Sequence, residues 1–227
     1  MKFNSLVYGA VSGSIGGITY AHNQGGMYAR ARAVPTNPNT AFQQVMRNSL
    51  SQLTTSWAGV LSAGQRTGWT TFAQNVPLLD ALGQARTIPP LAWFIKANSL
   101  RIQSGLTVIL TAPTVFELAV LSIPTPSITT GSANVSVAFP AGDAWAAEVG
   151  GAMLVWGSRA QSPTKNFYNG PYRFDGRING AATPPTSPQV VTMPFVAGPT
   201  GSKMFFKFVA VRADGRPSAV LRVAAIV

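Results

Sequence analysis

The chain has 227 residues, of which 46% are hydrophobic and 10% are charged, and it carries a net charge of +11 and no cysteine. The lack of cysteine excludes disulfides and thiolate zinc sites, and no apolar run reaches the ~18 residues of a membrane span or resembles a signal peptide. Soluble domains usually contain roughly 25% charged residues, so this composition indicates a surface that partners largely cover.

Positive charge is concentrated in the first half of the chain. Residues 1–105 carry eight basic side chains against the single acid Asp80, a net of +7, and the remainder carries nine against five, a net of +4. Such a field attracts a negatively charged partner, and nucleic acid, a membrane surface or an acidic protein lattice would each satisfy it.

Residues 9–34 have the pattern of a β-hairpin. Residues 18–22 and 27–34 alternate as strands do, and residues 23–26, Asn-Gln-Gly-Gly, tolerate the positive φ of a tight turn. A ribbon this rich in glycine buries little apolar area and is marginal alone, so we expect it to lie against a neighbouring protein.

Three helices are predicted after the hairpin. Apolar residues recur at spacings of three and four over residues 40–61, which predicts an amphipathic helix of about six turns. Ser62 and Gln65 form a capping box that starts a second, short helix. A third helix begins at Pro89-Pro90 and ends before Gly105. We expect the helices to pack as a three-helix bundle, with Trp57, Trp69, Phe72 and Trp93 inside it.

The second half of the chain has the pattern of a β-sandwich. Residues 106–114 are expected to form a linker, and in residues 115–227 short β-rich runs alternate with turn residues at intervals of roughly ten. The expected strands are residues 115–123, 133–139, 151–159, 172–178, 189–194, 203–212 and 219–227. The last two, with the turn Ala-Asp-Gly-Arg between them, resemble the final hairpin of fibronectin type III domains, and Trp156 is expected in the core.

The predicted fold class is therefore α+β. It consists of an N-terminal β-hairpin arm with a three-helix bundle, followed by a seven-stranded Ig/fibronectin III-like β-sandwich. The expected domains are residues 1–105 for anchoring and residues 115–227 for the sandwich.

The chain has few side chains of the types that build catalytic, metal or cofactor sites. Of the six acids only Asp143 and Glu148 are near neighbours; surface solvation of their loop is favoured over a carboxylate pair for glycoside hydrolysis. His22 has no second histidine or nearby acid to complete a metal site. The glycines of residues 9–17 lack the Gly-Lys-Ser/Thr of a phosphate-binding loop. We predict no enzyme, no cofactor and no metal.

Contacts to other molecules are expected at two places. Tyr28, Arg30 and Arg32 fall on one face of a strand, a pattern also used to bind nucleic acid, but hydrogen bonds and salt bridges to an adjacent subunit are favoured. The anchoring residues are predicted to be Tyr20, His22, Tyr28, Arg30, Arg32 and Arg47. In the second half, Phe167, Tyr168 and Tyr172 lie in a loop that is a candidate exposed contact, with sugar binding as one reading.

The order of motifs in residues 9–105 resembles a family. Gly-Ser-Ile-Gly-Gly-Ile-Thr-Tyr, Gly-Gly-Met-Tyr-Ala-Arg-Ala-Arg, Pro-Thr-Asn-Pro-Asn-Thr and Leu-Ser-Ala-Gly-Gln-Arg-Thr-Gly-Trp follow one another. This order resembles uncharacterised virion structural proteins of tailed phages and prophages.

The resemblance implies a virion protein made in the host cytoplasm. Its partners would be the major capsid protein or tail and neck proteins, in a homo-oligomer, with nucleic acid not favoured and no membrane. Capsid decoration is the first expectation, because a basic, acid-poor anchor suits an acidic capsid surface. A tail or neck component is the alternative; a DNA-associated internal protein and a carbohydrate-binding adhesion module are alternatives of another class.

Overall fold

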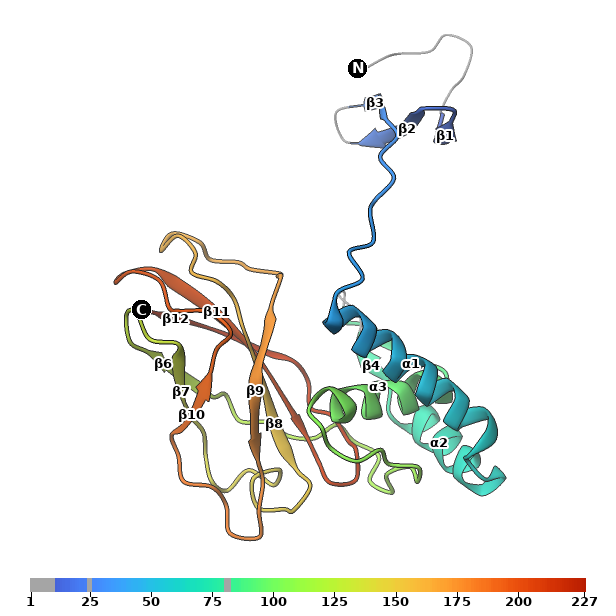
Figure 1. The fold of residues 1–227 in the computed structure, drawn as a ribbon. Coiled ribbons are helices and arrows are strands. Elements are labelled where there is room, and N and C mark those ends of the chain that lie inside the picture. Colours follow the sequence, from blue (N-terminus) through green and yellow to red (C-terminus); the bar gives the residue numbers. More distant parts are fainter. Residues whose placement is uncertain (1–10, 24–25, 80–82) are drawn as a thin grey trace. The chain divides into compact units, whose positions relative to one another are not determined.

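The computed structural model describes residues 11–23, 26–79 and 83–227 (Figure 1). Its contacts divide the chain into two compact units, residues 1–41 and residues 42–227. The architecture is mixed α and β, with three helices and antiparallel sheets among the described residues.

The N-terminal unit contains a three-stranded antiparallel sheet in the order β1-β2-β3. Its strands are β1 (Gly13–Ile15), β2 (Ile18–Asn23) and β3 (Gly26–Ala31). The predicted hairpin is present as β2 and β3, although β3 ends at Ala31 and not at Val34. The sequence did not predict β1, because its three residues are too few to show alternation.

A tight glycine turn adds β1 to this hairpin. Gly16 has φ +59, which favours glycine, and together with Gly17 it joins β1 to β2. Residues 24–25, in the predicted turn between β2 and β3, lie outside the described residues. Residues 32–40 follow β3 with no regular structure, and each is exposed. Their two prolines are compatible with such an extended path.

The helices are α1 (Ala41–Gly59), α2 (Ala63–Asn75) and α3 (Pro90–Gln103). The capping box is confirmed, since the Gln65 backbone N–H donates to Ser62 Oγ (3.2 Å) and the Ser62 N–H donates to Gln65 Oε1 (2.9 Å). Pro90 occupies the first turn of α3, where its missing N–H costs nothing. The predicted loop before α3 also contains a short ladder of β4 (Leu78–Leu79) and β5 (Ala85–Arg86).

One hydrophobic core joins residues of all three helices. Trp69, Phe72, Trp93 and Phe94 are buried in it, with Trp69 edge-on to Phe94 at 5.5 Å between ring centroids. The prediction that Trp69, Phe72 and Trp93 are packing residues is therefore confirmed, and Trp57 packs against the same core, half-buried.

Residues 125–226 contain seven strands in two antiparallel sheets. The orders are β10-β7-β6 and β12-β11-β8-β9. The strands are β6 (Thr125–Ile128), β7 (Asn134–Ala138), β8 (Ala152–Gly157), β9 (Arg173–Asn179), β10 (Gln189–Thr192), β11 (Lys203–Val211) and β12 (Leu221–Ile226). A shared core containing Val137 of β7, Val155 of β8, Val191 of β10 and Phe206 of β11 packs the two sheets together.

The predicted strand at residues 115–123 is wrong. That segment makes only an isolated bridge, Ala119 to Ser218, and the first strand of the sheets is β6. Pro126 lies within β6, although proline donates no hydrogen bond to a ladder. In the sheet, β6 is an edge strand, where a missing N–H is tolerated.

Helix α3 covers part of the outer face of the four-stranded sheet. Leu100 packs on a second buried cluster that includes Trp156 and Val209, so Trp156 is buried on this outer side and not between the sheets. The side chain of Arg101, 3% exposed, donates to the carbonyls of Thr107 (2.7 Å), Gly150 (3.2 Å) and Arg212 (3.0 Å).

These contacts group the helices with the C-terminal sheets, whereas the sequence placed them in one domain with the hairpin. The role of residues 106–114 as a linker stays a prediction.

Candidate functional site

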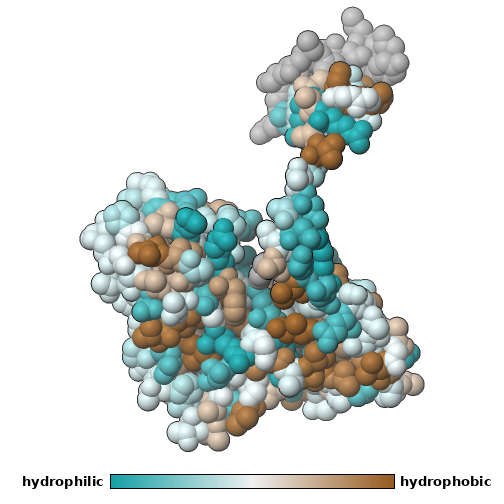
Figure 2. All heavy atoms as spheres, in the orientation of Figure 1, coloured by the Kyte–Doolittle hydropathy of each residue, from teal (hydrophilic) through white to brown (hydrophobic). Residues whose placement is uncertain are grey.

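The N-terminal sheet has one apolar and one polar face. The pairing places Ile18, Tyr20 and His22 on the face of β2 that Ile15 and Met27 share. Ile15 is 75% exposed and Ile18 is 44% exposed. Figure 2 shows apolar residues at the surface of the part that carries β1–β3. No described residue of this unit is buried, so the sheet has no core within the described part of the chain.

The opposite face of the sheet is polar and basic. Ser14, Thr19, Tyr28 and Arg30 share it, and Ser14 and Thr19 join their hydroxyls across the strands at 2.8 Å. The alternation thus places Tyr28 and Arg30 on one face, as predicted, while Tyr20 and His22 lie on the other. Arg32 follows the end of β3, where its backbone N–H donates to the Gly17 carbonyl at 2.8 Å.

The N-terminal unit contains no acid, because no Asp or Glu occurs before Asp80. Arg30 and Arg32 are both exposed. Their charges are therefore not balanced within their own unit. Arg47, the remaining predicted anchoring residue, is exposed on α1, whose Val45 and Leu50 also reach the surface.

The predicted contact loop of the second half is only partly exposed. Phe167 is 76% exposed, but Tyr168 is buried and stacks on Phe205 at 5.3 Å between ring centroids. Tyr168 also donates its hydroxyl hydrogen to the Pro171 carbonyl, and Tyr172 donates to the Tyr168 carbonyl. Tyr168 and Tyr172 therefore hold the loop together, and Phe167 is the one of the three that is available for contact.

The two carboxylates considered for hydrolysis have structural partners. Asp143 accepts hydrogen bonds from the Ser122 backbone and hydroxyl and from Trp145 Nε1. Glu148 forms a bidentate pair with Arg212, with contacts of 2.6 and 2.9 Å. These contacts replace the predicted role of solvating the loop surface. The pair instead ties the loop between β7 and β8 to its surroundings.

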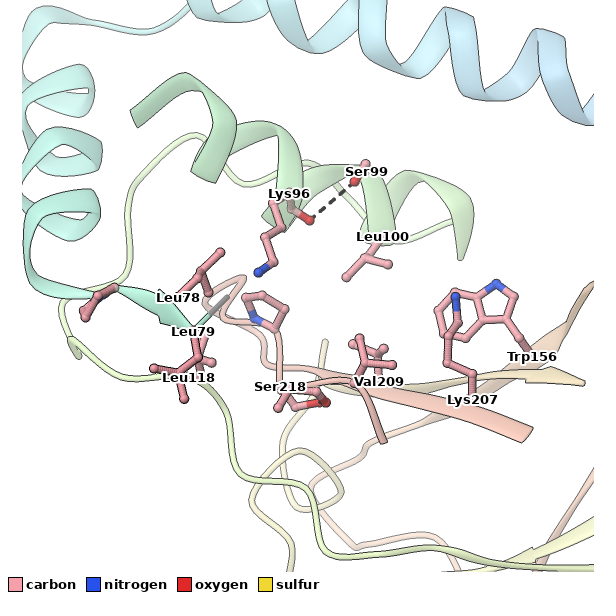
Figure 3. Close-up of a pocket in the computed structure, with 14 residues that line it drawn as sticks. Leu78, Leu79, Lys96, Ser99, Leu100, Leu118, Trp156, Lys207, Val209 and Ser218 are labelled. Atoms are coloured by element: carbon pink, nitrogen blue, oxygen red, sulfur yellow. Dashed lines mark hydrogen bonds between the residues drawn. The ribbon is translucent and has the colours of Figure 1, made fainter. Parts of the chain in front are cut away.

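A groove lies between α3 and the outer face of the four-stranded sheet, with an open volume of about 500 Å³ (Figure 3). Its walls are mostly apolar and include Leu78 of β4, Leu100 of α3 and Val209 of β11. Two lysines also line it, Lys96 from α3 and Lys207 from β11.

Both groove lysines stand against aromatic rings. The Lys96 ammonium lies 4.8 Å from the ring centre of Trp93, and the Lys207 ammonium lies 3.9 Å from that of Trp156. Burial lowers the pKa of Lys96 and of Lys207, and for Lys207 the positive charge of Arg222 adds to the effect. Neither lysine was predicted from the sequence as a site residue. The signal for Lys207 was its place inside an otherwise apolar strand, Met-Phe-Phe-Lys-Phe-Val.

A half-buried acid whose carboxylate oxygens are shielded from solvent lies elsewhere in the same sheet. Asp175 sits where the pairing of β8 and β9 slips by one residue, and neither carboxylate oxygen makes a hydrogen bond of normal geometry. Burial raises the pKa of Asp175 to about 7, against an opposing effect of the Gly157 backbone. The carboxyl group is therefore a candidate for titration near neutral pH.

The described residues form no cluster of three or more side chains suited to hold a metal ion. Among them, no helix combines the length and apolar character needed to cross a membrane. Comparison with protein-family models, with curated proteins and with solved structures found no match for this chain.

Proposed function

We propose that the protein is a non-enzymatic structural component of a virion, anchored to neighbouring subunits through residues 1–41. The observation that carries this proposal is the N-terminal sheet, which leaves Ile15 and Ile18 exposed on one face and Arg30 on the other. A three-stranded sheet with no buried residue in its described part gains stability when a partner covers its apolar face.

Charge favours a capsid surface as the partner. The unit contains Arg30 and Arg32 and no acid, so an acidic lattice would attract it over long range. This supports the role of a capsid decoration protein bound to the major capsid protein. A tail or neck component, also in contact with other copies and other virion proteins, is the alternative within the same class.

We further propose that residues 115–227 form an Ig/fibronectin III-like sandwich and that the helices form a three-helix bundle. In chain order, the first, second and fifth strands make one sheet, and the third, fourth, sixth and seventh make the other. Seven strands in two antiparallel sheets packed face to face are the architecture that such sandwiches share. Such a domain would project from, or brace, the particle.

The polar face of the N-terminal sheet supports nucleic-acid binding as an alternative function. Tyr28 and Arg30 lie side by side along β3, which suits a DNA-associated internal protein. In that case binding to duplex DNA should fall steeply as salt is raised, because bound phosphates release counterions.

Deletion of residues 1–40 tests the anchoring role. We expect the remaining unit to keep its folded circular dichroism spectrum, and incorporation into particles that lack the protein to be lost. A finer test is the double variant Ile15→Ser, Ile18→Ser, which removes the exposed apolar side chains of the sheet. The control is Val34→Ser, since Val34 is an exposed apolar residue outside the sheet.

The Ile15/Ile18 variant should lose incorporation and the Val34 variant should keep it. Incorporation that survives the deletion would refute the anchoring role, and so would a full-length chain that stays monomeric at high concentration with slow hydrogen exchange in β1–β3. Salt-sensitive DNA binding that is lost on deletion would support the DNA-associated alternative.

A further inference from the structure

We propose that the groove between α3 and the four-stranded sheet binds an extended acidic segment of a partner protein. The occupant would place an apolar side chain between two carboxylates. This inference stands on unit 42–227 alone and is independent of what the N-terminal sheet contacts.

Among the described residues, the two groove lysines have no carboxylate as a counter-ion, since none lies within salt-bridge distance of Lys96 or Lys207. Lys207 also stands directly opposite Arg222 on β12, a like-charge pair that destabilises a sheet. Each lysine is half-buried, so an arriving carboxylate would supply an ion pair that no described residue provides.

The floor and walls between the two lysines are apolar. Leu100 descends from α3 toward Val209 of β11, and Leu118 with Val220 extends the apolar lining. A volume of about 500 Å³ accommodates a short stretch of peptide. An apolar side chain placed there would be removed from water, which contributes affinity without depending on charge.

The positions of the two cations favour a peptide over a lipid anion. In Figure 3, Lys96 points into the groove beside Leu78, while Lys207 stands against Trp156 at the opposite end, with Leu100 and Val209 between them. A fatty acid has one anionic group at one end of its chain and satisfies only one lysine. An extended segment of the type acid-polar-apolar-polar-acid satisfies both, because alternate side chains of an extended chain point to the same side.

Fluorescence anisotropy of the full-length protein tests the proposal. The probe is a labelled peptide Gly-Glu-Ser-Leu-Ser-Glu-Gly, whose Glu and Leu side chains alternate onto one side of an extended chain, and the matched peptide carries Gln in place of both Glu residues. We expect the acidic peptide to bind about tenfold more tightly, and Lys96→Met with Lys207→Met to remove most of that difference. The control is Lys203→Met, because Lys203 also lies on β11 but outside the groove.

A second measurement needs no variant. Limited lysine acetylation of the wild-type protein, read by mass spectrometry, should slow at Lys96 and Lys207 when the acidic peptide is present, and should not change at Lys203. Equal binding of the two peptides, or protection that includes Lys203, would overturn the proposal. Tighter binding of dodecanoate than of the acidic peptide, with protection of one groove lysine, would assign the groove to a lipid anion instead.

Discussion

The two regions that differ most are both antiparallel sheets. In the N-terminal sheet β1-β2-β3, none of the described residues is buried. In the four-stranded sheet, every residue of β8 is buried, because the second sheet covers one face and α3 covers part of the other. The four-stranded sheet is therefore covered by other parts of its own unit, whereas no described residue of the N-terminal sheet is buried.

The largest expected difference in unfolding free energy is between a substitution in the core of the sandwich and one in the N-terminal sheet. Phe206→Ala removes a fully buried ring between the sheets and should lower the free energy of unfolding by about 3–5 kcal/mol. Tyr20→Ala, the matched change in the N-terminal sheet, should alter the unfolding of residues 42–227 by less than about 0.5 kcal/mol. Calorimetric melting measures both. A large loss in the Tyr20 variant would show that the units are energetically coupled.

A second change tests how the helices are joined to the covered sheet. Arg101→Met leaves the carbonyls of Thr107, Gly150 and Arg212 without their donor and should cost roughly 2–3 kcal/mol. Arg101→Lys, the control, keeps the charge but not the fork of donors, and should recover only part of the loss. Urea unfolding provides the values. Full stability of the methionine variant would contradict the proposed joining role.

The smallest effect concerns pH and Asp175. The pKa of this group is about 7 in the folded protein and roughly 3.9 when unfolded, so its contribution to stability is complete below pH ~4 and is lost as pH rises through about 7. Because the residue is not fully buried, we expect a loss of roughly 1–2 kcal/mol between pH 5 and 8.

Asp175→Asn should remove this loss of stability. Urea unfolding of the wild type and of the variant at pH 5 and at pH 8 measures the loss. Glu117→Gln, at an exposed carboxylate, is the control and should keep the wild-type profile. An unchanged pH dependence in the Asn variant would show that another group titrates.

Local chemistry made several elements predictable from the sequence. The capping box at Ser62 and Gln65 depends on residues three apart, and the spacing of apolar residues depends only on the geometry of a helix. Six of the seven C-terminal strands followed from alternation and turn residues in the same way. The residue-by-residue face assignment of Tyr28 and Arg30 also needed no more than the strand period.

Tertiary contacts decided the rest. Whether Pro126 is acceptable depends on β6 lying at a sheet edge, and whether Tyr168 is exposed depends on Phe205, which comes from a distant part of the chain. The groove could not be predicted, since Lys96 and Lys207 are far apart in sequence and line the same groove only because α3 packs on the sheet. The sequence alone determined which residues are strand, helix and turn formers, because those preferences act over a few residues. Only the folded chain decided which faces are covered, because burial depends on residues that are remote in the chain.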